Sequence, residues 1–318
     1  MDVTAWLLDG DPAVRWQTLR DVVGAPEDEV ALERARVATE GWGARLLELR
    51  GADGLWAGGA CFPRSVLDAW RAGLEPDFSE GQPWTATLPQ LALLRELGLD
   101  PGSEVARQVV AQVAAGCRWE HDDEAFFDGE VEACINGRTL AIGAYFGADV
   151  DALAARLLDD QLGDGGWNCW TEHGATVSSF DSTICVLEGL REVEAAHGSP
   201  AVTEARRRGE EYLLERGLFR SLRTGEVPEQ RWLEPAYPTR WHYDVLRALD
   251  HLRAAGGSPD PRAAEAVALV RDKQQADGRW LLERVHPGES DLLIEEAGRP
   301  SRWTTLRALR VLDWYDGR

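Results

Sequence analysis

The sequence predicts an all-α fold, formed as a single domain over residues 1–318, in which an inner ring of helices lies inside an outer ring. Two observations support this prediction. A short turn pattern, Q-x-x-D-G-x-W, recurs along the chain, and six similar helical segments lie around the turns. Internal repeats of this kind are typical of folds that stack one helix pair many times.

The turn pattern occurs at 161–167 and 274–280, and again at 50–56 with Arg50 in place of glutamine. Each copy follows a stretch with apolar residues at helical spacing. The glycine after the aspartate can adopt a positive φ, and the tryptophan offers a large face that can pack on helix ends. We therefore expect a structural clasp at each turn rather than a catalytic loop.

Six segments place threonine or aspartate ahead of an apolar residue near a helix start, and their first two turns carry little charge, as expected of an inner ring. They align on Thr18, Thr87, Thr139, Thr183, Asp244 and Thr305. The more charged outer helices are expected at about 28–50, 101–117, 149–162, 202–216 and 260–275, after a truncated first member at 2–8. Linkers are expected near 57–83, which should contain a short helix, and near 118–135, 217–238 and 284–299.

The composition limits the classes of function. A formal net charge of −21 without a basic patch argues against nucleic-acid binding. The five cysteines form no C-x-x-C pair, and the first residues lack the basic and apolar regions of a signal peptide. No window approaches the length of a membrane-spanning helix. A cytoplasmic protein without a transmembrane segment is the expectation.

The chain resembles the squalene and oxidosqualene cyclases and the β subunits of protein prenyltransferases. The recurring Q-x-x-D-G-x-W turn is the signature of that superfamily, and the similarity covers essentially the whole chain. The resemblance implies an (α/α)6 toroid, in which the glutamine and tryptophan clasp an outer helix to the next inner helix. It also implies a small hydrophobic or isoprenoid-like ligand in the central cavity.

The segment SSFDSTICVLEGL, at 178–190, resembles the acid motifs of the cyclases, D-x-D-D-T-A and D-C-T-A-E. The comparison places Asp181 on the aspartate that protonates the substrate and Thr183 on the threonine after it. Ser179 and Ser182 replace the accompanying acids, so a strong acid dyad is not evident. The alternative is that Asp181 is a helix N-cap or an acid of the first turn.

The prenyltransferases use the same helix to bind zinc, through an aspartate, a cysteine and a histidine. Asp181 and His242 match two of these ligands, whereas Thr183 stands at the cysteine position and Cys185 lies one turn further on. Asp181, Cys185 and His242 are therefore the expected ligands if zinc is bound. Acid–base chemistry without zinc requires no cofactor.

Polar and aromatic residues near the starts of the inner helices are expected to line the cavity. Asp181, His242 and Asp244 are the candidates for proton transfer. The candidates for substrate binding are Glu132, Asn136, Arg138, Arg240, Trp241, Tyr243 and Trp303. The polar run at 126–138 is either a lid ahead of the shortest inner helix or a solvated acidic loop.

The sequence thus predicts an enzyme of the terpene-cyclase and prenyltransferase type that acts on a small, partly hydrophobic ligand, with aromatic residues stabilising a developing cation. Two alternatives stay open. One is a zinc-dependent transferase on the same fold, and the other is a toroid that binds a ligand or a partner without catalysis.

Overall fold

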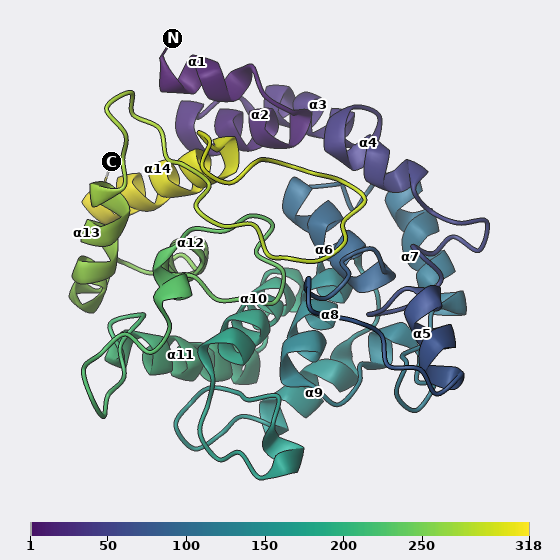
Figure 1. Cartoon of the computed structure of the whole chain (residues 1–318). Helices are drawn as coiled ribbons and strands as arrows, with labels where there is room; N and C mark the ends of the chain where they lie inside the picture. Colours follow the sequence, from purple (N-terminus) through teal and green to yellow (C-terminus); the bar gives the residue numbers. More distant parts are fainter. Residues whose placement is uncertain (1, 318) are drawn as a thin grey trace.

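Six helices form an inner ring in the computed structural model, which describes residues 2–317 (Figure 1). The inner helices are α2 (Pro12–Thr18), α6 (Thr87–Leu97), α8 (Ala133–Phe146), α10 (Phe180–His197), α12 (Val245–Ala254) and α14 (Arg302–Asp316). A π-helical turn, Leu19–Val23, extends α2. Each outer stretch returns the chain to the same rim, so the inner helices run parallel. The prediction of an all-α toroid is confirmed.

The outer ring lies close to the expected positions. It comprises α1 (Val3–Leu8), α3 (Glu27–Ala35), α4 (Gly41–Glu48), α7 (Glu104–Gly116), α9 (Asp151–Asp159), α11 (Pro200–Glu215) and α13 (Ala264–Asp272). The helix expected at 28–50 is broken, because Gly41 has a φ of +66° and lies against Asp11, whose carboxylate accepts the Trp42 N–H at 2.8 Å. That break turns α4 back toward the inner ring.

Contacts between α14, α2 and α6 close the inner ring. Arg310 of α14 donates to Gln17 of α2 at 3.1 Å, and Gln17 in turn donates to the backbone oxygen of Glu96 in α6 at 3.0 Å. The Trp16 indole donates to the Leu97 carbonyl at 2.9 Å. The last inner helix therefore meets the first, and the ring has no open edge (Figure 1).

The three Q-x-x-D-G-x-W turns make the same two hydrogen bonds. The indoles of Trp56, Trp167 and Trp280 each donate to a carbonyl ten residues earlier, near the end of the preceding outer helix, at 2.8, 2.7 and 2.7 Å. Their backbone N–H groups donate to Thr87, Thr183 and Thr305 at 3.4, 3.1 and 3.0 Å. The tryptophans thus join an outer helix to the next inner helix, as the sequence predicts.

The glutamine of the turn makes a different connection. Gln161 donates to the carbonyl of Gly165 within the turn and to that of Ala205 in α11, at 2.6 and 2.8 Å. It therefore links the end of one outer helix to the next outer helix. The Gln274 side chain donates to the Gly278 carbonyl within its own turn, at 3.3 Å.

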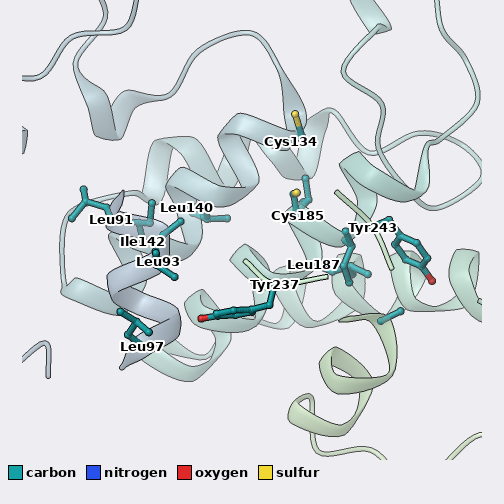
Figure 2. Close-up of a cluster of buried hydrophobic side chains, with 14 of the residues drawn as sticks. Leu91, Leu93, Leu97, Cys134, Leu140, Ile142, Cys185, Leu187, Tyr237 and Tyr243 are labelled. Atoms are coloured by element: carbon teal, nitrogen blue, oxygen red, sulfur yellow. The ribbon is translucent and has the colours of Figure 1, made fainter. Parts of the chain in front are cut away.

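Helices α8 and α10 approach each other more closely than a side chain at the contact would allow. A Cβ atom added to Gly137 would lie 2.6 Å from the Cys185 backbone, and one added to Gly189 would lie 2.5 Å from the Gly137 carbonyl. Apolar side chains such as Leu140 and Leu187 fill the surrounding core (Figure 2). This contact brings the first turns of α8 and α10 together.

The connections at the rim are long and contain little regular structure. The linker at 57–83 contains the expected short helix, α5 (Arg64–Arg71). Residues 2–317 hold no extended strand, only three isolated β-bridges. Within the same range, no helix is long and apolar enough to cross a membrane.

Candidate functional site

Two chain segments close the mouth of the ring at the N-terminal ends of the inner helices. We call residues 235–243 and 284–291 the plug; the second segment crosses the middle of the ring in Figure 1. Trp84, just before α6, donates its indole N–H to the Pro287 carbonyl and its backbone N–H to the Glu289 carbonyl, each at 2.8 Å. The rings of His242 and His286 stack with centroids 3.9 Å apart. The prediction that the first turns share one open central cavity is therefore wrong.

A smaller pocket remains at this rim, beside the plug, and we call it the α8–α10 pocket. Its volume is about 490 Å³, within the range of small-molecule sites. Of the sequence-predicted residues, Glu132, Arg138, Asp181 and Trp241 line it. Its other lining residues are Cys61, Phe62, Gln82, Cys134, Ile135, Asn168, Cys169, Trp170, Ser179 and Ser182. One pocket thus combines an apolar wall with charged and thiol groups.

Among the charged residues that line the pocket, Arg138 is the one without a hydrogen-bond or ion-pair partner in the described part of the chain. Its residue is only 6% exposed, yet its side chain makes no hydrogen bond or ion pair with any other residue in the range 2–317. A buried guanidinium is costly unless an acceptor or an anion pairs with it. The local pairing expected for a merely solvated loop is absent, and the group is available to a ligand.

Asp181 supplies a carboxyl group to the same pocket. It lies in the first turn of α10 but is not the cap, because Ser179 caps that helix through the Ser182 N–H at 3.1 Å. Asp181 instead accepts the Tyr243 N–H at 2.6 Å and contacts Arg231 at 3.5 Å. Burial raises the pKa of the Asp181 carboxyl, although the Tyr243 N–H and Arg231 act in the opposite direction.

Two cysteines and Glu132 form the third polar feature. The Cys169 sulfur accepts the Cys134 N–H, at the start of α8, at 3.1 Å and lies 3.1 Å from the Ser182 hydroxyl. The hydrogen bond from Cys134, followed by that from Ser182, lowers the pKa of the Cys169 thiol, whereas the pKa of Cys134 is raised. One ligand atom from each of Glu132, Cys134 and Cys169 lies within 4.8 Å of the others.

The zinc ligands implied by the resemblance do not come together. Cys185 is buried, with its sulfur 3.4 Å from the Trp241 carbonyl and 3.7 Å from the Arg247 guanidinium. His242 stacks between Trp241 and His286 in the plug, with ring centroids 3.7 and 3.9 Å away. Asp181, Cys185 and His242 do not form a group within coordination distance among the described residues.

His242 is also unsuited to donate a proton. Burial, His286 and nearby arginines lower the pKa of His242 to about 2, and burial with arginines lowers that of His286 to about 3. Both imidazoles are therefore neutral at physiological pH. The loop before α12, rather than its first turn, holds His242, since that helix begins at Val245.

Three more of the predicted residues, Asp244, Asn136 and Tyr243, make contacts that stabilise the fold. Asp244 is the N-cap of α12 and accepts the Arg247 N–H at 2.7 Å. Asn136 exchanges two hydrogen bonds with the backbone of Glu130, at 2.7 and 2.8 Å. Tyr243 packs in the core against Phe180 and Trp232. These contacts occupy the groups that were expected to act on a ligand.

Two further candidates lie deeper in the ring. Arg240 belongs to the plug and lies over the Trp84 ring, 5.2 Å from its centroid, with a 3.3 Å hydrogen bond to Ser290. Trp303 is buried and stacks on Tyr237 at 4.7 Å. Neither lines the α8–α10 pocket.

The polar run at 126–138 is neither a lid nor a simple loop. Its second half forms the first turns of α8, which begins at Ala133 and is one of the longer inner helices. Cys134 and Arg138 thereby become helix residues one turn apart that face the same pocket. The two residues are four apart in the sequence, which is a helical spacing, but the linker was expected to continue to about residue 135.

No protein-family model matches the chain, and no curated protein sequence matches it. Solved structures with a similar arrangement include a polysaccharide lyase, at 12% identity over 98% of this chain and 88% of the lyase, with a TM-score of 0.46. They also include the type II terpene cyclase MstE from Scytonema, at 15% identity over 88% of this chain and 97% of the cyclase, with a TM-score of 0.37. A variant of MstE in complex with its substrate, geranylgeranyl dihydroxybenzoate, has 16% identity over 90% and 97% of the two chains and a TM-score of 0.40. The likeness concerns the helical fold, so the chemistry has to be argued from the site.

Proposed function

We propose that the protein is an acid–base enzyme that binds a small, partly hydrophobic, isoprenoid-like ligand in the α8–α10 pocket and isomerises it. The observation that carries the proposal is the Arg138 guanidinium, which has no hydrogen-bond or ion-pair partner within residues 2–317 and lines one pocket with the carboxyl of Asp181. A positive anchor and a proton donor beside an apolar wall are the elements that such a reaction needs.

The pocket favours a ligand with two different ends. Arg138 would bind an anionic or strongly polar group, since a carboxylate or phosphate can pair with a guanidinium through two hydrogen bonds. Phe62, Ile135 and Trp241 offer apolar and aromatic surface for the remainder of the ligand. An isoprenoid chain attached to a carboxylate satisfies both requirements.

The proposed reaction begins with proton transfer from the protonated Asp181 carboxyl to a carbon–carbon double bond. A C–H bond forms, the electron pair of the double bond is used, and a cation develops on the other carbon. The aromatic faces of Trp241 and Phe62 can stabilise that cation. A second double bond closes a ring onto the cation, and loss of a proton to water or to the Asp181 carboxylate yields an isomer of unchanged mass.

Substitution of Arg138 tests the binding step, with geranylgeranyl dihydroxybenzoate as the probe because it joins an isoprenoid chain to a carboxylate. Arg138→Met should weaken binding by roughly 10-fold or more, since it removes a charged hydrogen-bond partner. Stability should be unchanged, because the wild-type guanidinium makes no hydrogen bond or ion pair within residues 2–317 that the substitution would remove. Calorimetric titration gives the affinity, and thermal unfolding gives the stability.

Arg156→Met is the matched control, since Arg156 is half-exposed on the neighbouring outer helix α9. It should bind the probe as the wild type does. Equal binding by Arg138→Met and the wild type would contradict the proposed anchor. Binding of the probe without conversion to an isomer would instead favour the alternative of a non-catalytic toroid.

A zinc-dependent transferase is the second candidate, supported by the group of Glu132, Cys134 and Cys169. These residues, rather than Asp181, Cys185 and His242, would hold the ion, and zinc bound there would activate a nucleophile by lowering its pKa. Zinc that copurifies in a one-to-one ratio and is lost in Cys169→Ser would favour this candidate. Protein that isomerises the probe after treatment with a chelator would favour acid–base chemistry without metal.

A further inference from the structure

A second cavity of about 530 Å³ lies within the ring and shares no lining residue with the α8–α10 pocket. All six inner helices contribute to it, and Tyr237 and Thr239 of the plug contribute as well. Eight arginines and five carboxylates line this arginine cavity, a formal excess of three positive charges. The excess lies inside a chain whose formal net charge is −21.

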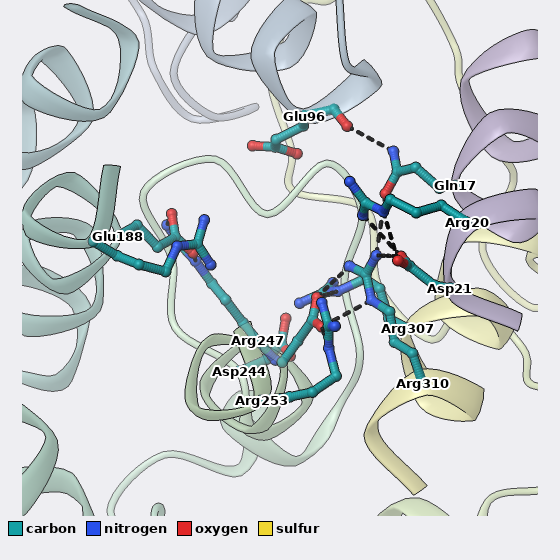
Figure 3. Close-up of polar contacts among 12 residues, drawn as sticks. Gln17, Arg20, Asp21, Glu96, Glu188, Asp244, Arg247, Arg253, Arg307 and Arg310 are labelled. Carbon is teal, nitrogen blue, oxygen red and sulfur yellow. Dashed lines mark hydrogen bonds and ion pairs between the residues drawn. The ribbon is translucent and has the colours of Figure 1, made fainter. Parts of the chain in front are cut away.

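The carboxylates of the cavity are shared among several guanidinium groups. Asp250 contacts Arg310, Arg253 at 3.0 Å and Arg307 at 3.5 Å. Asp21 accepts from Arg20 at 2.6 Å and contacts Arg310 at 3.2 Å. These arginines converge from α12, α14 and the turn after α2 (Figure 3). Each carboxylate therefore compensates only part of the charge around it.

The rest of the cavity has a smaller deficit of anions, with four arginines and three carboxylates. Glu192 pairs there with Arg95 and with Arg191, each at 2.9 Å. Glu188 pairs with Arg247 at 2.8 Å and with Arg95 at 3.6 Å. Arg34 has no carboxylate partner in the described part of the chain and donates to the Gly98 carbonyl and the Tyr145 hydroxyl. Glu96 makes no ion pair or hydrogen bond through its carboxylate within that part, and burial raises its pKa.

Three residues that line the cavity each carry a buried hydrogen-bond donor without a partner. The Nε of Arg95, the hydroxyl of Tyr237 and the indole N–H of Trp303 have no acceptor within residues 2–317. Buried donors are nearly always paired in folded proteins, and an unpaired one costs free energy. All three residues offer protons, so the missing partner is an acceptor.

Helix dipoles account for some of these arginines but not for the unpaired donors. Cations are stabilised at helix C-termini, and Arg95 and Arg253 lie in the last turns of α6 and α12. A dipole, however, provides no acceptor for the Tyr237 hydroxyl or the Trp303 indole. A ligand that accounts for both features must carry negative charge and offer hydrogen-bond acceptors.

We propose that the arginine cavity is a second binding site, one that takes a compact polyanion with at least two negative charges on phosphate or carboxylate oxygens. The anion would accept hydrogen bonds from Arg95, Tyr237 and Trp303 and would pair with the excess guanidinium charge of Arg307. The site is separate from the α8–α10 pocket and from the reaction proposed there.

Calorimetric titration of the full chain tests the site, with inorganic pyrophosphate and citrate as probes at constant ionic strength. One-to-one, saturable binding of at least one probe is the expected result. Pyrophosphate binding alone indicates a phosphate ligand, and citrate binding alone indicates a polycarboxylate. Sodium chloride at matched ionic strength should release no comparable heat.

Two variants with opposite effects locate the binding. Arg307→Gln should weaken it roughly 10-fold or more, because a charged hydrogen-bond partner of the anion is lost. Asp250 keeps Arg253 and Arg310 in that variant, so the fold should persist. Glu96→Gln removes a negative charge from the cavity and should strengthen binding several-fold.

Arg262→Gln and Arg138→Met are the controls, one on the outer surface and the other in the α8–α10 pocket. Both should bind the anion as the wild type does. The proposal is overturned if neither probe binds the wild type, or if binding is the same in folded Arg307→Gln and Glu96→Gln as in the wild type. Should Arg307→Gln fail to fold, unchanged binding by Glu96→Gln overturns it alone.

Discussion

Asp181→Asn should reduce conversion of geranylgeranyl dihydroxybenzoate by roughly 10²–10⁴-fold, the usual contribution of a positioned general acid, and should leave the fold intact. The asparagine oxygen can still accept the Tyr243 N–H, which the carboxylate accepts at 2.6 Å in the native protein. The substitution removes the titratable proton and the ion pair with Arg231, which lies 3.5 Å away. Chromatography with mass detection would follow the isomer, and thermal unfolding would monitor the fold.

The pH dependence of the activity is a second, independent test of the Asp181 carboxyl. Burial raises the pKa of Asp181 above its ordinary value. In the proposed reaction the protonated form is the active one. Activity should therefore fall as the pH rises through that pKa. The same shift means that the charged form destabilises the native state at higher pH, so Asp181→Asn should be at least as stable as the wild type near neutrality.

Asp159→Asn provides the matched control for Asp181→Asn, because Asp159 is an exposed acid at the end of α9. It should retain wild-type conversion and the wild-type pH profile. Full conversion by Asp181→Asn would assign the Asp181 carboxyl to positioning the Tyr243 backbone and would leave the acid unidentified.

Trp167→Ala and Trp280→Ala should each lower the free energy of unfolding by about 3–5 kcal/mol, the range for removal of a large buried aromatic side chain. Both side chains are fully enclosed, at 0% and 1% exposed, and both indoles donate to helix carbonyls at 2.7 Å. Their loss leaves a cavity and an unpaired carbonyl at the junction of two helices. Chemical denaturation followed by circular dichroism measures the change.

Trp170→Ala separates the clasp from the pocket. Trp170 lies three residues after Trp167 but is 67% exposed and lines the α8–α10 pocket, so its removal should cost little stability. Probe binding should be unchanged in the folded fraction of Trp167→Ala. A Trp167→Ala protein of full stability that fails to bind the probe would show that the turn belongs to the site.

The ring was predictable from the sequence because its turns carry their own partners. Each tryptophan bonds to a carbonyl ten residues earlier, and each N–H reaches a threonine in the next inner helix. Because these contacts recur in each copy of the turn, they can be predicted from the repeated sequence without knowledge of the whole fold. The inner and outer helices then follow from apolar spacing.

The plug was not predictable in the same way. Its segments, 235–243 and 284–291, show no helical periodicity, and their positions depend on contacts such as Trp84 with Pro287, which lie 203 residues apart in the sequence. A linker can equally lie outside the ring. Because the plug lies inside it, His242 and Arg240 are packed away from the pocket that they were expected to line.

The site was predictable only in part, for a physical reason at the start of α8. Asn136 satisfies the Glu130 backbone from within the helix, so the helix begins at Ala133 and Cys134 joins Arg138 on the pocket face. Arg138 and Asp181 were identified from their residue types and positions. The contribution of Cys169 depends on the approach of α8 to α10, which no local pattern encodes.

An experimental structure of the protein with geranylgeranyl dihydroxybenzoate bound would test whether Arg138 and Asp181 act together on one ligand in the α8–α10 pocket. The carboxylate of the probe should lie within hydrogen-bond distance, about 2.7–3.2 Å, of the Arg138 guanidinium. A double bond of the chain should lie near Oδ2 of Asp181, the oxygen that does not accept the Tyr243 N–H, with the chain against Trp241. A probe bound in the arginine cavity, or in the α8–α10 pocket with its carboxylate directed away from Arg138, would contradict the account.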